Sequence, residues 1–181
     1  MIVSIVEPQP SWFAVTTRSR HEKAAATACH GQGITCFLPM IEEERRWSDR
    51  KKRIATPVFP GYLFVCIERT AEAQVRVLKI PGVADFVKNR QGPIAAAEHE
   101  LENVRKVLSR GIPVAAHPCL TAGDRVRVTR GPLAGVEGAF VRAGGRTRIL
   151  ISVQLIQQAV AVEVEEADVE LLSNADLRVC A

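Results

Sequence analysis

The most cationic part of the chain is the run "RRWSDRKKR", in which six basic residues surround a single acid, Asp49. Basic side chains neutralise nucleic-acid phosphates, and an aromatic ring can stack on a base or pack on its own domain. The run therefore predicts contact with nucleic acid, with a solvated hairpin loop as the alternative. The residues concerned are Arg45, Arg46, Trp47, Arg50, Lys51, Lys52 and Arg53.

The stretch that follows, "VFPGYLFV", is apolar enough for a buried strand but is interrupted by Pro60-Gly61. Proline cannot donate to a sheet ladder, and glycine weakens a strand interior. Phe59 and Leu63 share one face of an extended chain, and Tyr62 lies on the other, so both faces are apolar. Such a strand is either sandwiched or presents one face to a partner.

Recognisable catalytic and metal-binding patterns are missing. The segments His21-Glu22 and Glu98-His99-Glu100 lack the spacing that places two imidazoles on one helical face, and we expect solvated helix residues there. The cysteine and histidine spacings do not match a structural zinc site, so small buried hydrophobes are expected at the cysteines. We therefore predict a binding protein rather than an enzyme, with no catalytic residue, metal or cofactor.

Composition sets the broad class. The 181 residues carry a net charge of +4 and are 47% hydrophobic, which is sufficient for one ordinary domain or two small ones. The five cysteines are odd in number and contain no Cys-x-x-Cys spacing, and the start of the chain lacks the features of a signal peptide. No apolar run reaches the length of a membrane span. We expect a cytoplasmic protein with reduced thiols and no membrane association.

Strand and helix signals alternate in the first part of the chain. Helices are predicted at 19–32, 70–79 and 98–110, the last with Leu101, Val104 and Leu108 on one face. Strand formers occupy 12–16, 34–41, 54–67, where two segments meet near Pro60-Gly61, and 83–88. This order predicts an α+β domain in which a sheet positions the apolar stretch and the cationic run.

The pattern changes after the proline-containing segment 111–122, which has no clear period and is expected to be a linker. From Asp124 onward, valines and isoleucines alternate with polar residues between glycine turns, as expected of a small antiparallel barrel. The composition of 155–172 would also suit a helix, and that alternative stays open beside the valine alternation of a strand.

Four ordered pieces of the sequence resemble one protein family. They are "WFAVTTRSRHEKAAA", "FPGYLFV", "VLKIPGVADFVKN" and "GDRVRVTRGPLAGVEGAFV", and together they resemble the NusG family of transcription elongation factors. The resemblance implies an NGN domain, an antiparallel sheet flanked by helices, joined to a KOW domain, a five-stranded SH3-like barrel. The expected limits are a tail at 1–10, the NGN domain at 11–110, a linker at 111–122, the KOW domain at 123–173 and a tail at 174–181.

The resemblance also implies a function. Members of the family bind the clamp helices of the largest RNA polymerase subunit through the NGN domain and suppress pausing or termination, and we expect a monomer that does the same. The cationic run falls where the family has a loop near upstream or non-template DNA. The positions expected to contact polymerase are Phe13, Phe59, Pro60, Gly61, Tyr62 and Phe86.

The KOW part departs from the housekeeping pattern, because Leu133 and Val136 replace common aromatics and Gln154-Leu155-Ile156 replaces a usual turn. This is similar to the specialised UpxY- and RfaH-like antiterminators of particular operons. The family's KOW partners, termination factor Rho or a small-subunit ribosomal protein, are possible partners here. The matching motif residues are Gly123, Val126, Val128, Gly131, Pro132, Leu133, Gly135, Val136 and Gly138.

A second function is also compatible with the sequence. The barrel could belong to an RNA-binding or ribosome-associated KOW protein that uses one basic face to contact phosphates. The residues that would form this face are Arg125, Arg127, Arg142, Arg146 and Arg148.

Overall fold

The computed structural model describes residues 9–47, 50–118, 124–143 and 146–172, which form two compact units. The first unit contains the described residues up to 38 together with 60–98, and the second contains 39–59 together with the described residues from 99 onward. Within these residues, three α-helices accompany several antiparallel sheets, which confirms the predicted α+β class.

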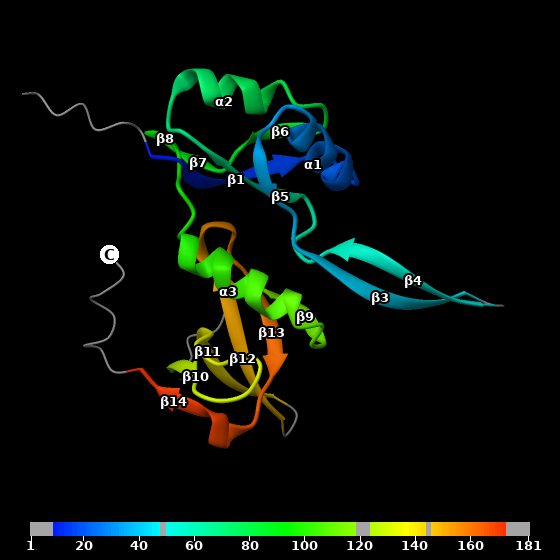
Figure 1. The fold of residues 1–181 in the computed structure, drawn as a ribbon, viewed down its shortest axis with the longest axis vertical. Helices are drawn as coiled ribbons and strands as arrows, with labels where there is room; N and C mark the ends of the chain where they lie inside the picture. The colour runs from blue at the N-terminus through cyan, green and yellow to red at the C-terminus, as the bar shows by residue number, and fades with distance from the viewer. Residues whose placement is uncertain (1–8, 48–49, 119–123, 144–145, 173–181) are drawn as a thin grey trace, which may run out of the picture. The chain divides into compact units, whose positions relative to one another are not determined.

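The first unit is built on a four-stranded antiparallel sheet with the order β2-β5-β1-β6 (Figure 1). Aromatic and β-branched residues favour these strands because they pack well on a pleated surface. The sheet consists of β1 (Ser11–Thr17), β2 (Thr35–Phe37), β5 (Tyr62–Ile67) and β6 (Val83–Phe86). A two-stranded sheet, β7 (Lys88–Asn89) and β8 (Gly92–Pro93), follows β6.

Two helices, α1 (Glu22–Gly31) and α2 (Ala71–Leu78), pack on this sheet close to their predicted positions (Figure 1). The alanine-rich face of α1 brings it near the strands, and the Thr70 side chain caps α2 by accepting the Ala73 N–H at 3.2 Å. The shared core includes Phe13, Val15, Ala25, Ala26, Leu63, Val65 and Val77.

The second unit begins with an antiparallel ribbon formed by β3 (Met40–Trp47) and β4 (Arg50–Pro57) (Figure 1). The cationic run was predicted to be a loop, but its described residues belong to these strands, so that prediction was wrong. A two-stranded ribbon can form from charged residues, because its ladder is made of backbone hydrogen bonds. Charge density alone therefore does not identify a loop.

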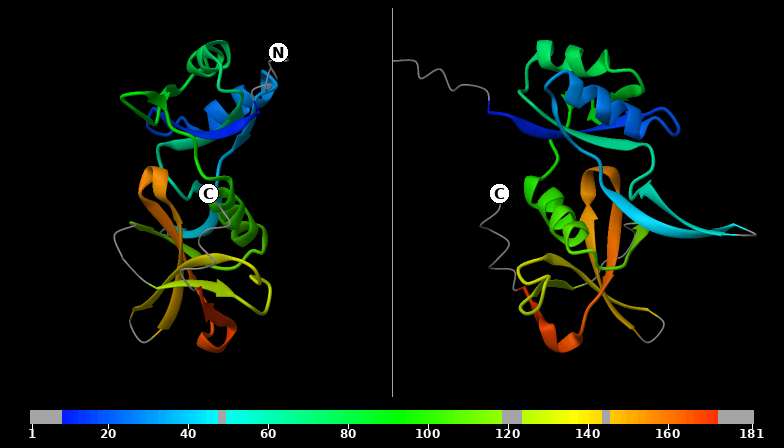
Figure 2. Two further views of the ribbon diagram at one scale, coloured as in Figure 1. Left: turned by 90° about the vertical axis from the view of Figure 1, so that its left-hand side faces the viewer. Right: turned by 45° about the vertical axis from the view of Figure 1, so that its right-hand side comes forward.

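A six-stranded antiparallel sheet with the order β14-β10-β11-β12-β13-β9 forms most of the second unit. Figure 2 shows these strands coiling around one another, as expected of a small barrel. The strands are β9 (Val114–Pro118), β10 (Arg125–Val128), β11 (Glu137–Ala143), β12 (Arg146–Val153), β13 (Gln158–Glu163) and β14 (Val169–Leu171), with short 3₁₀ turns η1 (Gln154–Ile156) and η2 (Glu166–Asp168).

The C-terminal segment 155–172 is strand and short turn rather than a long helix, so the alternation of valines decides its structure. Val160 and Val162 are fully buried on β13, whose register pairs them with Ile151 and Ile149 of β12. Within the predicted linker, β9 pairs with β13 along the edge of the sheet. Its last residue, Pro118, is tolerated because an edge strand can leave one backbone position without a donor.

Helix α3 (Glu98–Ser109) matches the predicted helix to within one residue. Leu101, Val104 and Val107 are its buried residues, whereas Leu108 is half-buried, so the buried face differs by one position from the predicted one. The described part of the chain contains no helix long and apolar enough to cross a membrane.

Candidate functional site

The Pro60-Gly61 turn joins the end of the ribbon to β5 and is held by two hydrogen bonds. Gly61 has a φ of +83°, a backbone conformation that side chains rarely adopt. Its N–H donates to Oε1 of Glu22 at 2.8 Å, and its carbonyl accepts the Thr17 N–H at 2.8 Å. Both peptide groups of the glycine are therefore fixed, and the exposed Pro60 is presented by a defined backbone.

Glu22 is the residue at this turn that sequence reasoning missed. It was predicted to be a solvated helix residue, but it is only 7% exposed and is part of the buried face of α1. A buried carboxylate requires hydrogen-bond donors, and the Gly61 N–H supplies one. The signal available in the sequence was its position, since Glu22 shares a helical face with Ala25, Ala26 and Cys29.

The six residues predicted to contact polymerase differ in exposure. Phe13 and Phe86 are buried in the core of the first unit, where their rings form an edge-to-face pair with centroids 6.1 Å apart. Phe59 is also buried, at 1% exposure. Gly61 and Tyr62 are half-buried and Pro60 is exposed, so these three consecutive residues form the accessible part of the set.

The other face of the sheet explains why β5 is apolar on both sides. Phe64 is opposite Ala14 of β1 and Phe37 of β2, and it is completely buried. Its ring lies 6.3 Å from that of Phe37. Neighbouring aromatic and apolar side chains of the same sheet therefore account for part of the apolar character of this face.

The register of the ribbon places basic residues opposite one another. Arg45 is opposite Lys52 and Arg46 is opposite Lys51, while Trp47 is opposite Arg50 and Arg53 is opposite Glu44. Like charges directly across an antiparallel pair are unfavourable, so this arrangement costs stability unless an anion is nearby. The basic part of the ribbon, at the end of β3 and the start of β4, is consequently a candidate nucleic-acid contact. Both the backbone pairing and the composition support this assignment.

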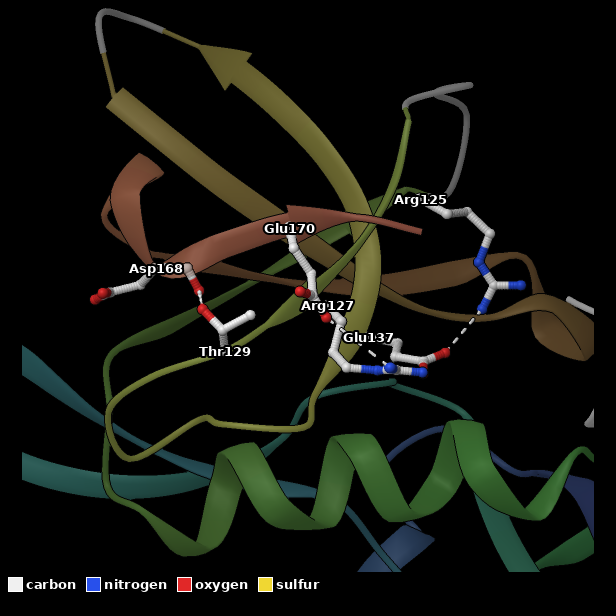
Figure 3. Close-up of polar contacts among 6 residues, drawn as sticks. All are labelled: Arg125, Arg127, Thr129, Glu137, Asp168 and Glu170. Atoms are coloured by element: carbon white, nitrogen blue, oxygen red, sulfur yellow. Dashed lines mark hydrogen bonds and ion pairs between the residues drawn. The ribbon is translucent and has the colours of Figure 1, made fainter. Parts of the chain in front are cut away.

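The arginines of the barrel have carboxylate partners. Figure 3 shows Glu137 between Arg125 and Arg127, whose guanidinium groups lie 3.4 and 2.7 Å from its carboxylate oxygens. Arg146 and Arg148 both contact Glu163, at 2.9 and 3.2 Å, and Arg142 pairs with Glu166. All five arginines of the predicted RNA-binding face thus have a carboxylate partner in the same barrel, which reduces its attraction for phosphate.

These ion pairs affect proton affinity. Hydrogen bonds from Arg146 and then Arg148 hold the pKa of the Glu163 carboxyl below its usual value. In the first unit, Lys88 and then the Phe86 N–H lower the pKa of Asp85 in the same way. Both carboxylates therefore remain charged at neutral pH, where they form ion pairs with their basic partners.

The KOW-motif residues form β10, a tight turn and the start of β11, except that Gly123 lies outside the described residues. Gly135 N–H donates to the Val128 carbonyl at 2.7 Å, closing the turn. At Gly138 a Cβ atom would stand 2.5 Å from the Leu150 carbonyl oxygen and would also collide with Ile149. Glycine is needed there because β11 and β12 approach closely. Leu133 and Val136 are buried.

Helix α3 contacts the barrel through polar groups that the sequence did not indicate. Lys106 Nζ donates to the Ala134 carbonyl at 2.7 Å, and Glu100 accepts the Gln154 N–H at 3.1 Å. Glu100 was expected to be solvated, but burial raises its pKa, with the Gln154 hydrogen bond acting in the opposite direction. These contacts place α3 with the barrel in the second unit, whereas the predicted domain limits placed it in the first domain.

Within the described residues, no group of three or more His, Cys, Asp or Glu side chains is arranged to hold a metal ion. The first unit offers a turn fixed by hydrogen bonds, and the second unit offers a basic ribbon and a barrel with internally paired charges.

Comparison with known proteins identifies relatives across most of the chain. The model of the family described as transcription termination factor nusG matches residues 10–105. The transcription termination/antitermination protein NusG of Thermus thermophilus is 27% identical over 163 residues, covering 78% of this chain and 89% of that protein. The protein of the same name from Lactococcus lactis is 26% identical over 179 residues, covering 92% of this chain and 96% of its own.

A solved structure supports the fold. The structure of Thermotoga maritima NusG covers 91% of this chain and 98% of its own, with a TM-score of 0.52 and 20% sequence identity. The family match includes β1, the Pro60-Gly61 turn and most of α3, which are the elements described above. The chain therefore belongs to the NusG family.

Proposed function

We propose that this protein is a transcription elongation and antitermination factor that binds RNA polymerase through its first unit and suppresses pausing or termination. The observation that carries the proposal is the Pro60-Gly61 turn, fixed by Glu22 and Thr17 within the family-matched region. A pre-organised turn loses little conformational entropy when a partner docks, so its exposed residues contribute efficiently to affinity.

Direct contact with the clamp helices of the largest polymerase subunit is assigned to Pro60, Gly61 and Tyr62. The buried aromatics Phe13, Phe59 and Phe86 have a supporting role, because they are core residues rather than accessible ones. Substitution of a buried aromatic would destabilise the fold and would not test binding cleanly. Tyr62 is therefore the informative position.

The cationic ribbon supplies the nucleic-acid part of this function. Its basic residues contact upstream or non-template DNA while the turn holds the polymerase, and the contact relieves the cross-strand repulsion in the ribbon. Apolar contacts carry most of the affinity, and the ribbon adds a component that weakens with salt.

The barrel recruits a protein rather than RNA phosphate, because its arginines are already paired with carboxylates. Rho or a small-subunit ribosomal protein fits this role. A specialised, operon-specific role rests on the turn Gln154-Leu155-Ile156, since the aliphatic Leu133 and Val136 are buried and shape the core instead of the surface.

The test is binding of the purified protein to core RNA polymerase, with and without a nucleic-acid scaffold, and to the scaffold alone. Binding that requires polymerase is expected, and Tyr62→Ala should weaken it by roughly tenfold or more if Tyr62 is a central contact. The matched control is Leu78→Ala, which removes another partly exposed apolar side chain of the same unit and should leave binding unchanged.

Two outcomes would contradict the proposal. A folded Tyr62→Ala protein with wild-type affinity would remove the turn from the interface. Tight binding to scaffold RNA without polymerase would favour the RNA-binding alternative and shift attention to the barrel.

A further inference from the structure

A groove of about 380 Å³ opens beside β14, at one end of the barrel sheet. Apolar side chains form most of its lining, and two exposed acids stand with them. The lining residues are Asp124, Val126, Phe140, Glu166, Val169 and Leu171. The groove therefore combines an apolar surface with negative charge.

Leu171 occupies a position of the barrel interior that the barrel leaves uncovered. It is directly opposite Val126 in the register of β10 and β14, so the two side chains lie on the same face of the sheet. Val126 is only 2% exposed, whereas Leu171 is 71% exposed. The other exposed large apolar side chains of the described residues, Val75 and Leu78, are 47% and 43% exposed. Covering Leu171 would therefore remove more apolar surface from water than covering either of these.

Phe140 forms another apolar wall of the groove. Gly138 is opposite Val126, and Phe140 follows two residues later on β11, so its side chain lies on the same face as Val126. The guanidinium carbon of Arg142 lies 6.0 Å from the centre of the Phe140 ring, and Arg142 is also paired with Glu166. Arg142 consequently adds no unbalanced positive charge to the groove.

The backbone of β14 is paired on one side only, because β14 is the end strand of the described sheet. The Leu172 N–H donates to the Arg125 carbonyl at 2.8 Å, and Glu170 is opposite Arg127, as Figure 3 shows. Alternate residues of an antiparallel strand direct their backbone groups to the same side. The N–H and carbonyl of Leu171 therefore point away from β10.

The free edge presents one donor and two acceptors. Val169 has the same backbone direction as Leu171, but its N–H donates to the Glu166 carbonyl. The Val169 carbonyl and both backbone groups of Leu171 have no hydrogen-bond partner in the part of the chain that the structure describes. Such an edge is a template for one more strand, and the groove lies directly beside it.

The charge around the groove indicates which strand would fit. Glu166 is paired, but the exposed Asp124 and Glu165 have no ion-pair partner among the described residues. A second copy of this edge would bring the same acids together, which is unfavourable, whereas lysine and arginine side chains complement them. A basic segment therefore fits better than a second copy of the chain.

We propose that the groove beside β14 binds an extended basic and apolar segment of a protein partner. The segment adds a strand to the free edge of β14, places one apolar side chain between Phe140 and Leu171, and directs a basic side chain to Asp124. The inference rests on the proposed recruitment of a protein by the barrel. It requires neither polymerase nor DNA.

The experiment measures binding of a labelled peptide, Lys-Val-Lys-Leu-Lys-Val-Lys, to the full-length protein by fluorescence anisotropy. Saturable binding is expected, and NMR should show slower hydrogen exchange at the Leu171 amide in the complex. The acidic peptide Glu-Val-Glu-Leu-Glu-Val-Glu should not bind, because the groove carries negative charge. The basic peptide with N-methyl groups on alternate backbone nitrogens should bind weakly, because it cannot donate to the edge.

Variants test the side chain and the backbone of the edge separately. Leu171→Ala should weaken binding of the basic peptide by roughly fivefold or more, without opening a cavity, since Leu171 is exposed. Leu171→Pro removes only an N–H that faces away from β10, so it should weaken binding and preserve the fold. Val75→Ala, another exposed apolar position, is the matched control and should bind as wild type does. Circular dichroism checks the folding of each variant.

Several outcomes would overturn the inference. They are no binding of the basic peptide, equal binding of the acidic one, or wild-type affinity in a folded Leu171→Ala protein. Self-association that Leu171→Ala abolishes would assign the groove to a second copy. Peptide binding only after removal of residues 173–181 would assign it to the end of this chain.

Polymerase binding, measured in parallel, separates this inference from the proposed function. Leu171→Ala should bind core polymerase as wild type does, because polymerase contact is assigned to the first unit. Polymerase binding without peptide binding would reject only the groove. Peptide binding without polymerase binding would support the groove and reject the polymerase contact.

Discussion

The ribbon β3–β4 and the barrel are both rich in arginine, but the neighbours of those arginines differ. In the ribbon the register places Arg45 opposite Lys52 and Arg46 opposite Lys51. In the barrel one carboxylate, Glu137 or Glu163, serves two arginines at once. Barrel arginines that already have a carboxylate partner should therefore attract a polyanion less strongly than their number suggests.

The largest expected effect comes from removing charge from the ribbon. Substituting Arg50, Lys51 and Lys52 by glutamine should lower affinity for a polymerase–scaffold complex more than tenfold at low salt. The slope of log K against log salt should become shallower by about 2 to 3, because three phosphate contacts are lost. Fluorescence anisotropy across a salt series measures both quantities.

The matched control removes the same charge from the barrel. Arg142, Arg146 and Arg148 changed to glutamine should alter the slope by much less than the ribbon variant, since these residues are already paired. Equal changes in the two triple variants would abolish the distinction between the regions.

A smaller effect is expected when the barrel arginines lose their carboxylate partners. Replacing Glu137 and Glu163 by glutamine removes the partners of Arg125, Arg127, Arg146 and Arg148. Nonspecific binding to single-stranded RNA should then rise severalfold and depend more steeply on salt. The comparison protein carries Glu68→Gln and Glu72→Gln, two changes of equal charge in the first unit, and should show no comparable gain.

A single charge reversal can place an acidic residue opposite an arginine of the ribbon. Lys51→Glu places an acid opposite Arg46 and should stabilise the ribbon by about 0.2 to 1 kcal/mol relative to the like-charged pair. Hydrogen exchange at the amides of β3 and β4 should slow accordingly. Lys88→Glu, outside the ribbon, should leave those amides unchanged. Faster exchange in Lys51→Glu would show that like charges are not what limits ribbon stability.

The smallest effect is the pH dependence of the barrel ion pairs. Arg146 and Arg148 lower the pKa of Glu163, so their stabilisation is present above the unfolded-state pKa, at about pH 4.3. It is lost as pH falls through the lower folded-state value. Thermal unfolding followed from pH 6 to pH 3 should show a slightly shallower decline for Glu163→Gln than for wild type. Identical profiles would contradict a role for Glu163 in acid stability.

Sequence reasoning succeeded where a local period was strong. The alternating valines of β13 and the amphipathic pattern of α3 predicted those elements, because side-chain direction repeats with the backbone period. It failed at the ribbon and at Glu22 because both depend on contacts between segments that are distant in the sequence. Hydrogen bonds between distant backbone segments give the cationic run its strand structure, and the Gly61 N–H makes burial of Glu22 tolerable.

The sequence by itself determined the family resemblance, the α+β class and the position of the Pro60-Gly61 break. Only the tertiary structure decided which of the expected contact aromatics are accessible and that the barrel arginines have carboxylate partners. The physical reason is distance along the chain. Periodicity and turn chemistry act over a few residues, whereas burial and ion pairing depend on contacts between segments that folding brings together.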